Sequence, residues 1–385
     1  MKSQMKTILT TFKQLSLILL GSTAGLALYA GEAEAPAAAS QDTTKYLETV
    51  RKKYKLPGFA VVVVKDGVIC DRAATGVRAA GHAELVTTND LFHIGSCTKS
   101  MTATLAAMLI EDGKLRWDTT VAEIFPEWKG KMDPGYESVT VEQLLQHRGG
   151  LAGEPPSGAW TEARKENGTP TEQRLAFVEA ALKKAPKAAP GTKMIYSNQG
   201  YALVGAMIEK VTGQPYEELI TAKLFKPLHM DSAGFGPPGT RGKFDQPWGH
   251  KRTLGLNVPL QEDNPPAIAP AGRVHCSLDD MARYTIAHME GEKKGGLLKP
   301  ETFLRLHTPP EKGDYACGWV CVRRGWAGGR AMMHNGSNTM WYIVMWLAPK
   351  KDFSVIVATN IGEEQSTFQG CDDVAGAMID KWLGK

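Results

Sequence analysis

The chain has 385 residues, 43% apolar and 22% charged, which is typical of a globular protein with a large buried core. Its 45 Lys and Arg residues nearly balance 41 Asp and Glu residues, giving a net charge of +4. Because the basic residues are interspersed with acidic ones, the sequence argues against a nucleic-acid-binding surface.

Residues 1–39 are interpreted as a signal peptide followed by a spacer. Three lysines precede an apolar stretch at 15–30, and small residues follow it. Gly and Ser interrupt the stretch, which favours a cleaved signal over the alternative, an uncleaved anchor. The candidate cleavage positions are Ala30, Ala35 and Ala39. We therefore expect export to the periplasm or medium, without stable membrane insertion after cleavage.

The first elements after the spacer are predicted to be a helix and three strands. The helix would be capped at 42–44 by Asp and Thr side chains. A valine-rich run at 59–64 and a strand at 68–71 flank Asp66-Gly67, a favoured hairpin turn. A third strand is expected at about 75–78.

The middle of the chain is predicted to be helical. Apolar residues recur at helical spacing, and Thr140 and Ser277 begin helix-capping patterns. The Gly- and Pro-rich stretch Ala233–Asn264 is expected to be irregular and to wall a cleft. The predicted helices are 98–111, 171–183, 199–211 and 216–224, with others after Thr140 and Ser277.

Strand patterns return near the C-terminus, at 318–323, 330–334, 341–347 and 353–359, before a final helix at 372–383. Strands at both ends with helices between them predict an α+β fold. Its antiparallel sheet would be formed by both chain ends and flanked by the terminal helices, with a large helical insertion. We expect one domain at 40–385. Its α/β lobe would span about 40–90 plus 313–385, and its helical lobe about 91–312.

Six cysteines in an exported chain permit disulfides without requiring them. Cys317 and Cys321, expected on one strand, would lie about 13 Å apart, too far to pair. Cys97 and Cys276, the latter expected to open a helix, are a possible pair, and buried free thiols are an equal alternative. No cluster has metal-ligand spacing, so neither a metal nor another cofactor is expected.

Three short strings carry chemistry: Ser96-Cys97-Thr98-Lys99, Tyr196-Ser197-Asn198 and His334-Asn335-Gly336. Each alone is weak, because Ser3–Lys6 and His147–Gly149 match the same patterns.

Together the strings could supply a nucleophile, a base and a proton relay. Lys99 lies one helical turn after Ser96, within reach of its hydroxyl. A lysine base must be partly neutral, which requires burial or nearby cations to lower its pKa.

The surroundings of these strings strengthen the interpretation. The segment from Phe92 to Ala103, the segments around Pro190 and Tyr196, and His334–Ser337 closely resemble penicillin-recognising serine hydrolases. The likeness is to the branch of class C β-lactamases, DD-peptidases and β-lactamase-like esterases. It runs from about Lys45 to the C-terminal helix and implies a β-lactamase/transpeptidase-like fold.

The resemblance also implies roles for individual residues. Ser96 would attack a substrate carbonyl and form an acyl-enzyme, while Lys99 and Tyr196 would share the proton transfers, either being the principal base. Asn198 would contact the acyl side chain and help to fix Lys99.

The resemblance further implies an oxyanion hole. The backbone N–H groups of Ser96 and Ser337 would form it, a type of site that contributes several kcal/mol to catalysis. Gly336 would allow the close backbone approach that this requires.

Departures from the family pattern bear on the substrate. His334 stands where Lys-Thr-Gly members carry a lysine that suits a substrate carboxylate, and an imidazole is mostly neutral near pH 7. A merely structural role for His334 is the alternative. His147-Arg148-Gly149 replaces a His-Thr-Ser pattern. Met340 and Trp341 could narrow the cleft or belong to the core.

The sequence therefore predicts a serine hydrolase acting on a small-molecule or peptide ester or amide, more esterase- or peptidase-like than an efficient β-lactamase. One alternative is a β-lactamase or D-amino-acid peptidase acting on cell-wall-type substrates. Another is a catalytically silent binding protein with the same fold. The oligomeric state stays open.

Overall fold

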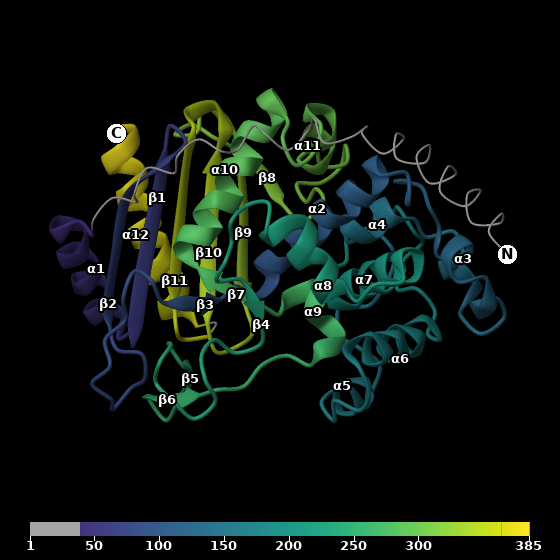
Figure 1. The fold of residues 1–385 in the computed structure, drawn as a ribbon, viewed down its shortest axis with the longest axis horizontal. Helices are drawn as coiled ribbons and strands as arrows, with labels where there is room; N and C mark the ends of the chain where they lie inside the picture. The colour runs from purple at the N-terminus through teal and green to yellow at the C-terminus, as the bar shows by residue number, and fades with distance from the viewer. Residues whose placement is uncertain (1–38, 363, 385) are drawn as a thin grey trace, which may run out of the picture. The chain divides into compact units, whose positions relative to one another are not determined.

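A six-stranded sheet combines the two ends of the chain (Figure 1). The structure, a computed structural model, describes residues 39–362 and 364–384. The predicted signal peptide and the second Ser-x-x-Lys match, Ser3–Lys6, lie outside the described residues. Within the described ranges no helix is both long and apolar enough to cross a membrane.

Two adjacent inner strands of the sheet come from opposite ends of the chain. β1 pairs antiparallel with β11, so that Val62 lies opposite Ile356. All neighbouring strands run antiparallel, which confirms the predicted α+β class. The order is β2 (Val68–Gly76), β1 (Gly58–Lys65), β11 (Phe353–Thr359), β10 (Tyr342–Ala348), β9 (Gly329–Ser337) and β8 (Val320–Arg324).

Both faces of the sheet are covered by helices. Val61 and Val63 of β1 belong to the apolar cluster with α1 (Gln41–Tyr54) and α12 (Gln365–Leu383), the terminal helices. Val62 and Val64 point to the other face, where α10 packs against β1 and β11. This double burial explains the unbroken valine run in β1, because each side chain meets an apolar neighbour whichever way it points. The bounds of α10 are Leu278–Lys294.

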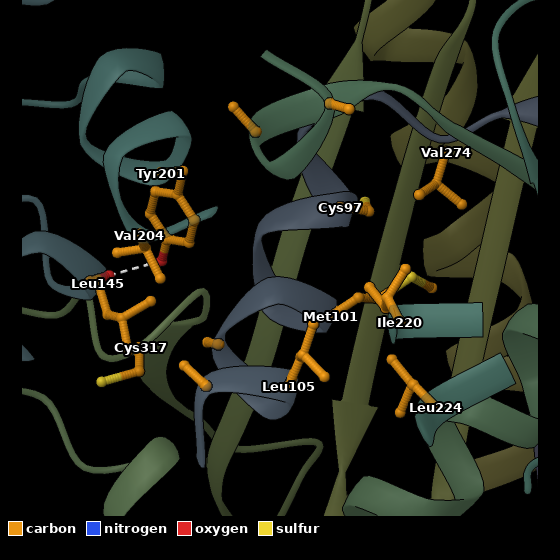
Figure 2. Close-up of a cluster of buried hydrophobic side chains, with 14 of the residues drawn as sticks. Cys97, Met101, Leu105, Leu145, Tyr201, Val204, Ile220, Leu224, Val274 and Cys317 are labelled. Atoms are coloured by element: carbon orange, nitrogen blue, oxygen red, sulfur yellow. Dashed lines mark hydrogen bonds between the residues drawn. The ribbon is translucent and has the colours of Figure 1, made fainter. Parts of the chain in front are cut away.

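The helical part of the molecule surrounds α2 (Thr98–Glu111), which was predicted to the residue. Every residue of α2 from Thr98 to Leu109 is buried, as expected for a helix enclosed on all sides. Figure 2 shows Met101 and Leu105 in the cluster that surrounds it. The other helices are α3 (Val121–Ile124), α4 (Val141–Leu145), α5 (Ala159–Ala163), α6 (Pro170–Leu182), α7 (Asn198–Thr212), α8 (Tyr216–Ile220), α9 (Ala269–Gly272) and α11 (Pro300–Leu306).

Several predicted boundaries are wrong for local physical reasons. Ser40, not the 42–44 segment, caps α1, and its hydroxyl accepts a hydrogen bond from the N–H of Thr43. No third strand forms at 75–78, because β2 itself continues to Gly76. α12 begins at Gln365, seven residues before the predicted start.

The segment predicted as irregular contains a short strand and a hairpin. β4 (Gly234–Phe235) joins β7 (Val274–Ser277) and β3 (Leu91–His93) in a small sheet. The hairpin pairs β5 (Gly249–Thr253) with β6 (Leu256–Leu260).

The cysteines are unpaired. All six are free, five of them buried, so the free-thiol alternative is the one found. Cys276 lies in β7 and does not open a helix, although Ser277 caps α10 as predicted.

Replacement of Ile356 by Ala should destabilise the whole molecule. The side chain is fully buried in β11, so its loss should lower the free energy of unfolding by about 2–5 kcal/mol. The control is Val68→Ala, at a 45%-exposed position of β2, which should change it by less than about 1 kcal/mol. Urea unfolding followed by circular dichroism measures both, and equal effects would contradict the central place of β11.

Candidate active site

Ser96 lies in a tight turn packed against the end of β9. The turn, Gly95–Cys97, is 3-10 helical and continues directly into α2. A Cβ atom at Gly336 would lie only 2.6 Å from the nitrogen of Ser96, and one at Gly95 only 2.2 Å from the nitrogen of Ser337. Glycine is therefore required at both positions, because a side chain at either one would push the two backbone segments apart.

Gly95 was not identified from the sequence as a site residue. Its φ of 48° lies in the left-handed region, so a side chain would be strained there even without the contact to β9. The only available signal was a glycine directly before the nucleophile position.

The amine of Lys99 is fully buried and surrounded by three oxygen atoms. Nζ lies 2.9 Å from Oγ of Ser96, 2.8 Å from Oδ1 of Asn198 and 2.7 Å from the carbonyl oxygen of Ala271. Burial lowers the pKa of this amine to about 7. Lys99 can therefore exchange a proton near neutral pH, whereas an exposed lysine could not. The contribution of Ala271, in α9, was not predicted.

Tyr196 completes the junction of the first two strings. The centroid of its ring lies 4.8 Å from Nζ of Lys99, and 39% of the residue is exposed. Asn198, two positions later, is the first residue of α7. Two strings separated by about a hundred residues thus meet at one amine.

His147, which the sequence did not single out as a site residue, holds the segment that carries Tyr196. Its carbonyl oxygen accepts from the N–H of Ile195 at 2.7 Å, and Nδ1 accepts from the N–H of Ser197 at 3.1 Å. The two rings of His147 and Tyr196 lie 4.3 Å apart. Burial, and then the charge of Lys99, holds the pKa of His147 well below its ordinary value, so the ring stays neutral.

His334 is buried beside the same amine and is neutral as well. Nδ1 lies 2.6 Å from the carbonyl oxygen of Asn335, so it must carry the proton, and Nε2 accepts from the hydroxyl of Tyr315 at 3.0 Å. Burial, and then the charge of Lys99, lowers the pKa of His334 to about 4. Both ring nitrogens are occupied within the protein.

A cavity of about 410 Å³ adjoins Asn198. Its walls include the 153–158 segment, Trp160 and Phe177, all from the helical part of the chain. Met340 and Trp341 do not line it, because both are buried in the core, which was one of the two predicted alternatives.

The fold and the assembled strings are those of the penicillin-recognising serine hydrolase superfamily. The family description "Beta-lactamase" matches residues 43–376, and the chain belongs to this family.

Among similar curated proteins, penicillin-binding protein 4 of Amycolatopsis lactamdurans is 29% identical over 246 residues, covering 63% of this chain and 62% of that protein. Protein flp of Staphylococcus aureus (strain N315) is 24% identical over 336 residues, covering 84% of this chain and 64% of that protein. The chain thus spans less than two thirds of the length of these relatives.

Two solved structures share the fold. A structure described as the octameric penicillin-binding protein homologue from Pyrococcus abyssi has a TM-score of 0.72 and 26% identity, covering 89% of this chain and 78% of that one. SurE has a TM-score of 0.72 with 21% identity, covering 89% and 76%, and shows likeness of fold alone.

Replacement of Gly336 by Ala should separate β9 from the Ser96 turn. Its Cβ would meet backbone atoms, the nearest being the carbonyl oxygen of Ile94 at 2.1 Å, and backbone cannot rotate away. We expect the free energy of unfolding to fall by about 1–3 kcal/mol or more.

The matched control is Gly376→Ala in α12, where a Cβ would meet nothing within 4 Å. There the free energy of unfolding should rise by about 0.5–1 kcal/mol, since alanine favours the helix. Thermal and urea unfolding measure both variants. A Gly336→Ala protein as stable as the parent would contradict the close packing described for β9.

Proposed function

We propose that the protein is an exported hydrolase that cleaves an ester or amide bond through an acyl-enzyme on Ser96. Lys99 would take the hydroxyl proton of Ser96, and Tyr196 would share its transfer to the leaving group. The N–H groups of Ser96 and Ser337 would stabilise the oxyanion, with Gly336 permitting their approach. Asn198 would bind the acyl group beside the cavity that it adjoins.

The arrangement of oxygen atoms around Lys99 carries this proposal. A neutral amine has two N–H bonds and one lone pair. The carbonyl oxygen of Ala271 and Oδ1 of Asn198 can only accept, so they take the two N–H bonds. The lone pair is then left for the third neighbour, the hydroxyl of Ser96, which is the geometry of a base and its nucleophile.

The state of His334 supports an esterase- or peptidase-like substrate. A neutral imidazole with both nitrogens engaged offers no positive charge to a substrate carboxylate. Turnover of β-lactams or D-amino-acid peptides is the second candidate. The name of the penicillin-binding relative favours it, at 29% identity.

Ser96→Ala tests the assignment. The parent should be labelled by a fluorophosphonate at one site and should hydrolyse p-nitrophenyl acetate, whereas the variant should lose both with an unchanged melting temperature. Intact-mass spectrometry locates the adduct. Labelling that survives in the variant would refute the role of Ser96. Nitrocefin and D-Ala-D-Ala peptides, assayed in parallel, separate the two candidate substrate classes.

The rate of Ser96 acylation should rise with pH around a midpoint near 7. The neutral amine is the active form of Lys99, and its fraction grows as pH passes its lowered pKa of about 7. His334, with a pKa of about 4, does not titrate in this range. Fluorophosphonate labelling rates between pH 5 and 9 provide the measurement.

The control for this pH profile is Lys99→Met, which lacks a titratable group. It should be slower by about 100-fold or more and should show no step near pH 7. A parent profile that is flat between pH 6 and 8 would exclude Lys99 as the base.

A further inference from the structure

A buried carboxylate, Asp263, lies behind the Ser96 turn and has no part in the roles proposed above. It is 3% exposed, and three polar side chains surround it. Nε2 of His93 lies 2.9 Å from Oδ1, and Nδ2 of Asn338 donates to Oδ1 at 3.0 Å. Nε of Arg273 lies 3.3 Å from Oδ2.

The first contact leads to the nucleophile turn. His93 ends β3, and its Nδ1 accepts a hydrogen bond from the N–H of Gly95 at 3.1 Å. Its proton must therefore be on Nε2, the atom that faces Asp263. Gly95 is the residue with a left-handed backbone directly before Ser96. Asp263 thus orients the imidazole that holds this unusual backbone in place.

The second contact leads to the end of β9. Asn338 directly follows Ser337, and its Oδ1 accepts from the N–H groups of Met340 and Trp341, both at 3.2 Å. Because Nδ2 faces the carboxylate, Oδ1 is directed to these two N–H groups. Asp263 thereby also orients the amide that folds the turn after Ser337.

The carboxylate is charged. Burial alone would raise its pKa, but interactions with His93, the Arg273 guanidinium and Asn338 outweigh burial and lower it. The carboxylate accepts a hydrogen bond from Asn338 and lies against the side chains of His93 and Arg273, and these three contacts offset the cost of burying its charge.

We propose that Asp263 is a positioning residue for the oxyanion hole. Through His93 on one side and Asn338 on the other, it fixes the two chain segments whose N–H groups, those of Ser96 and Ser337, would bind the oxyanion. The inference rests on the proposed function. Such donors are effective only when held in place before the reaction, and small misplacements cost large factors in rate.

Asp263→Asn tests the proposal, because it keeps the size of the side chain but replaces one carboxylate oxygen with an NH2 group. This group would direct its N–H bonds at neighbours that are themselves donors. The turnover number for an ester should fall by about 10- to 100-fold, with KM changed less than about threefold. Melting temperature is recorded for each variant.

The decisive readout is the rate ratio between an oxoester and the thionoester with the same acyl group. Sulfur is a weak acceptor, so an intact oxyanion hole favours the oxoester. This ratio should shrink by about tenfold in Asp263→Asn, whereas a general loss of structure would lower both rates together. Asn338→Ala, which leaves the pairs with His93 and Arg273 in place, should shift the ratio in the same direction and covers the case in which Asp263→Asn does not fold.

The matched control is Asp71→Asn. Asp71 is also buried, and it binds Thr43 and Lys381 at the far edge of the sheet. The Asp71→Asn variant should be less stable than the parent but should keep the parent's rate ratio between the oxoester and the thionoester.

Amide hydrogen exchange by mass spectrometry gives a readout that needs no turnover. Segments 94–97 and 336–339 should exchange faster in Asp263→Asn but not in Asp71→Asn. If the parent protein hydrolyses neither ester, the proposed function is refuted. The exchange rates would then still show whether Asp263 holds the two segments in place. A parent-like ester ratio together with parent-like exchange in both segments would overturn the role of Asp263.

Discussion

The approach of two backbone segments, at Gly95 and Gly336, is the constraint on which the rest of the site depends. One segment enters α2 and the other ends β9, and neither can carry a side chain at the contact. The sheet places β9, and the burial of α2 on all sides places Ser96. The large core therefore holds these two backbone segments against each other, which requires rigid elements on both sides.

The electrostatics of the site follow from burial more than from charge pairing. Lys99, His147 and His334 lie close together, and desolvation favours the neutral form of each. The neutral rings also avoid placing like charges beside Lys99. The arrangement leaves the lysine amine as the group nearest to Ser96 whose protonation changes at neutral pH.

Much of the fold could be predicted because the physical signals are local. The bounds of α2 followed from its apolar spacing and from Asp112-Gly113, and the valine run of β1 marked a strand. The hairpin of β5 and β6 was missed because β5 has a polar sequence without apolar alternation, and Pro259 lies inside β6, where a proline argues against a strand.

The parts of the site that could not be predicted depend on distant contacts. Lys99 and Ser96 share one helical turn, so their meeting follows from spacing. His147 meets Ser197 across 50 positions, and Asp263 meets Asn338 across 75, through loops whose paths no periodicity reveals. The carbonyl of Ala271 is a backbone atom, and residue type says nothing about its use.

The pairing of β1 with β11 has a consequence for biosynthesis. The carbonyl oxygen of Gly58 accepts a hydrogen bond from the Thr359 hydroxyl, 301 positions later. During translation the edge of β1 that pairs with β11 therefore stays unpaired until almost the whole chain has left the ribosome. Gly336 and Ser337 are themselves made late. A chain that terminates before β9 thus contains Ser96 and Lys99 but lacks both the strand that packs against the Ser96 turn and the C-terminal strands of the sheet.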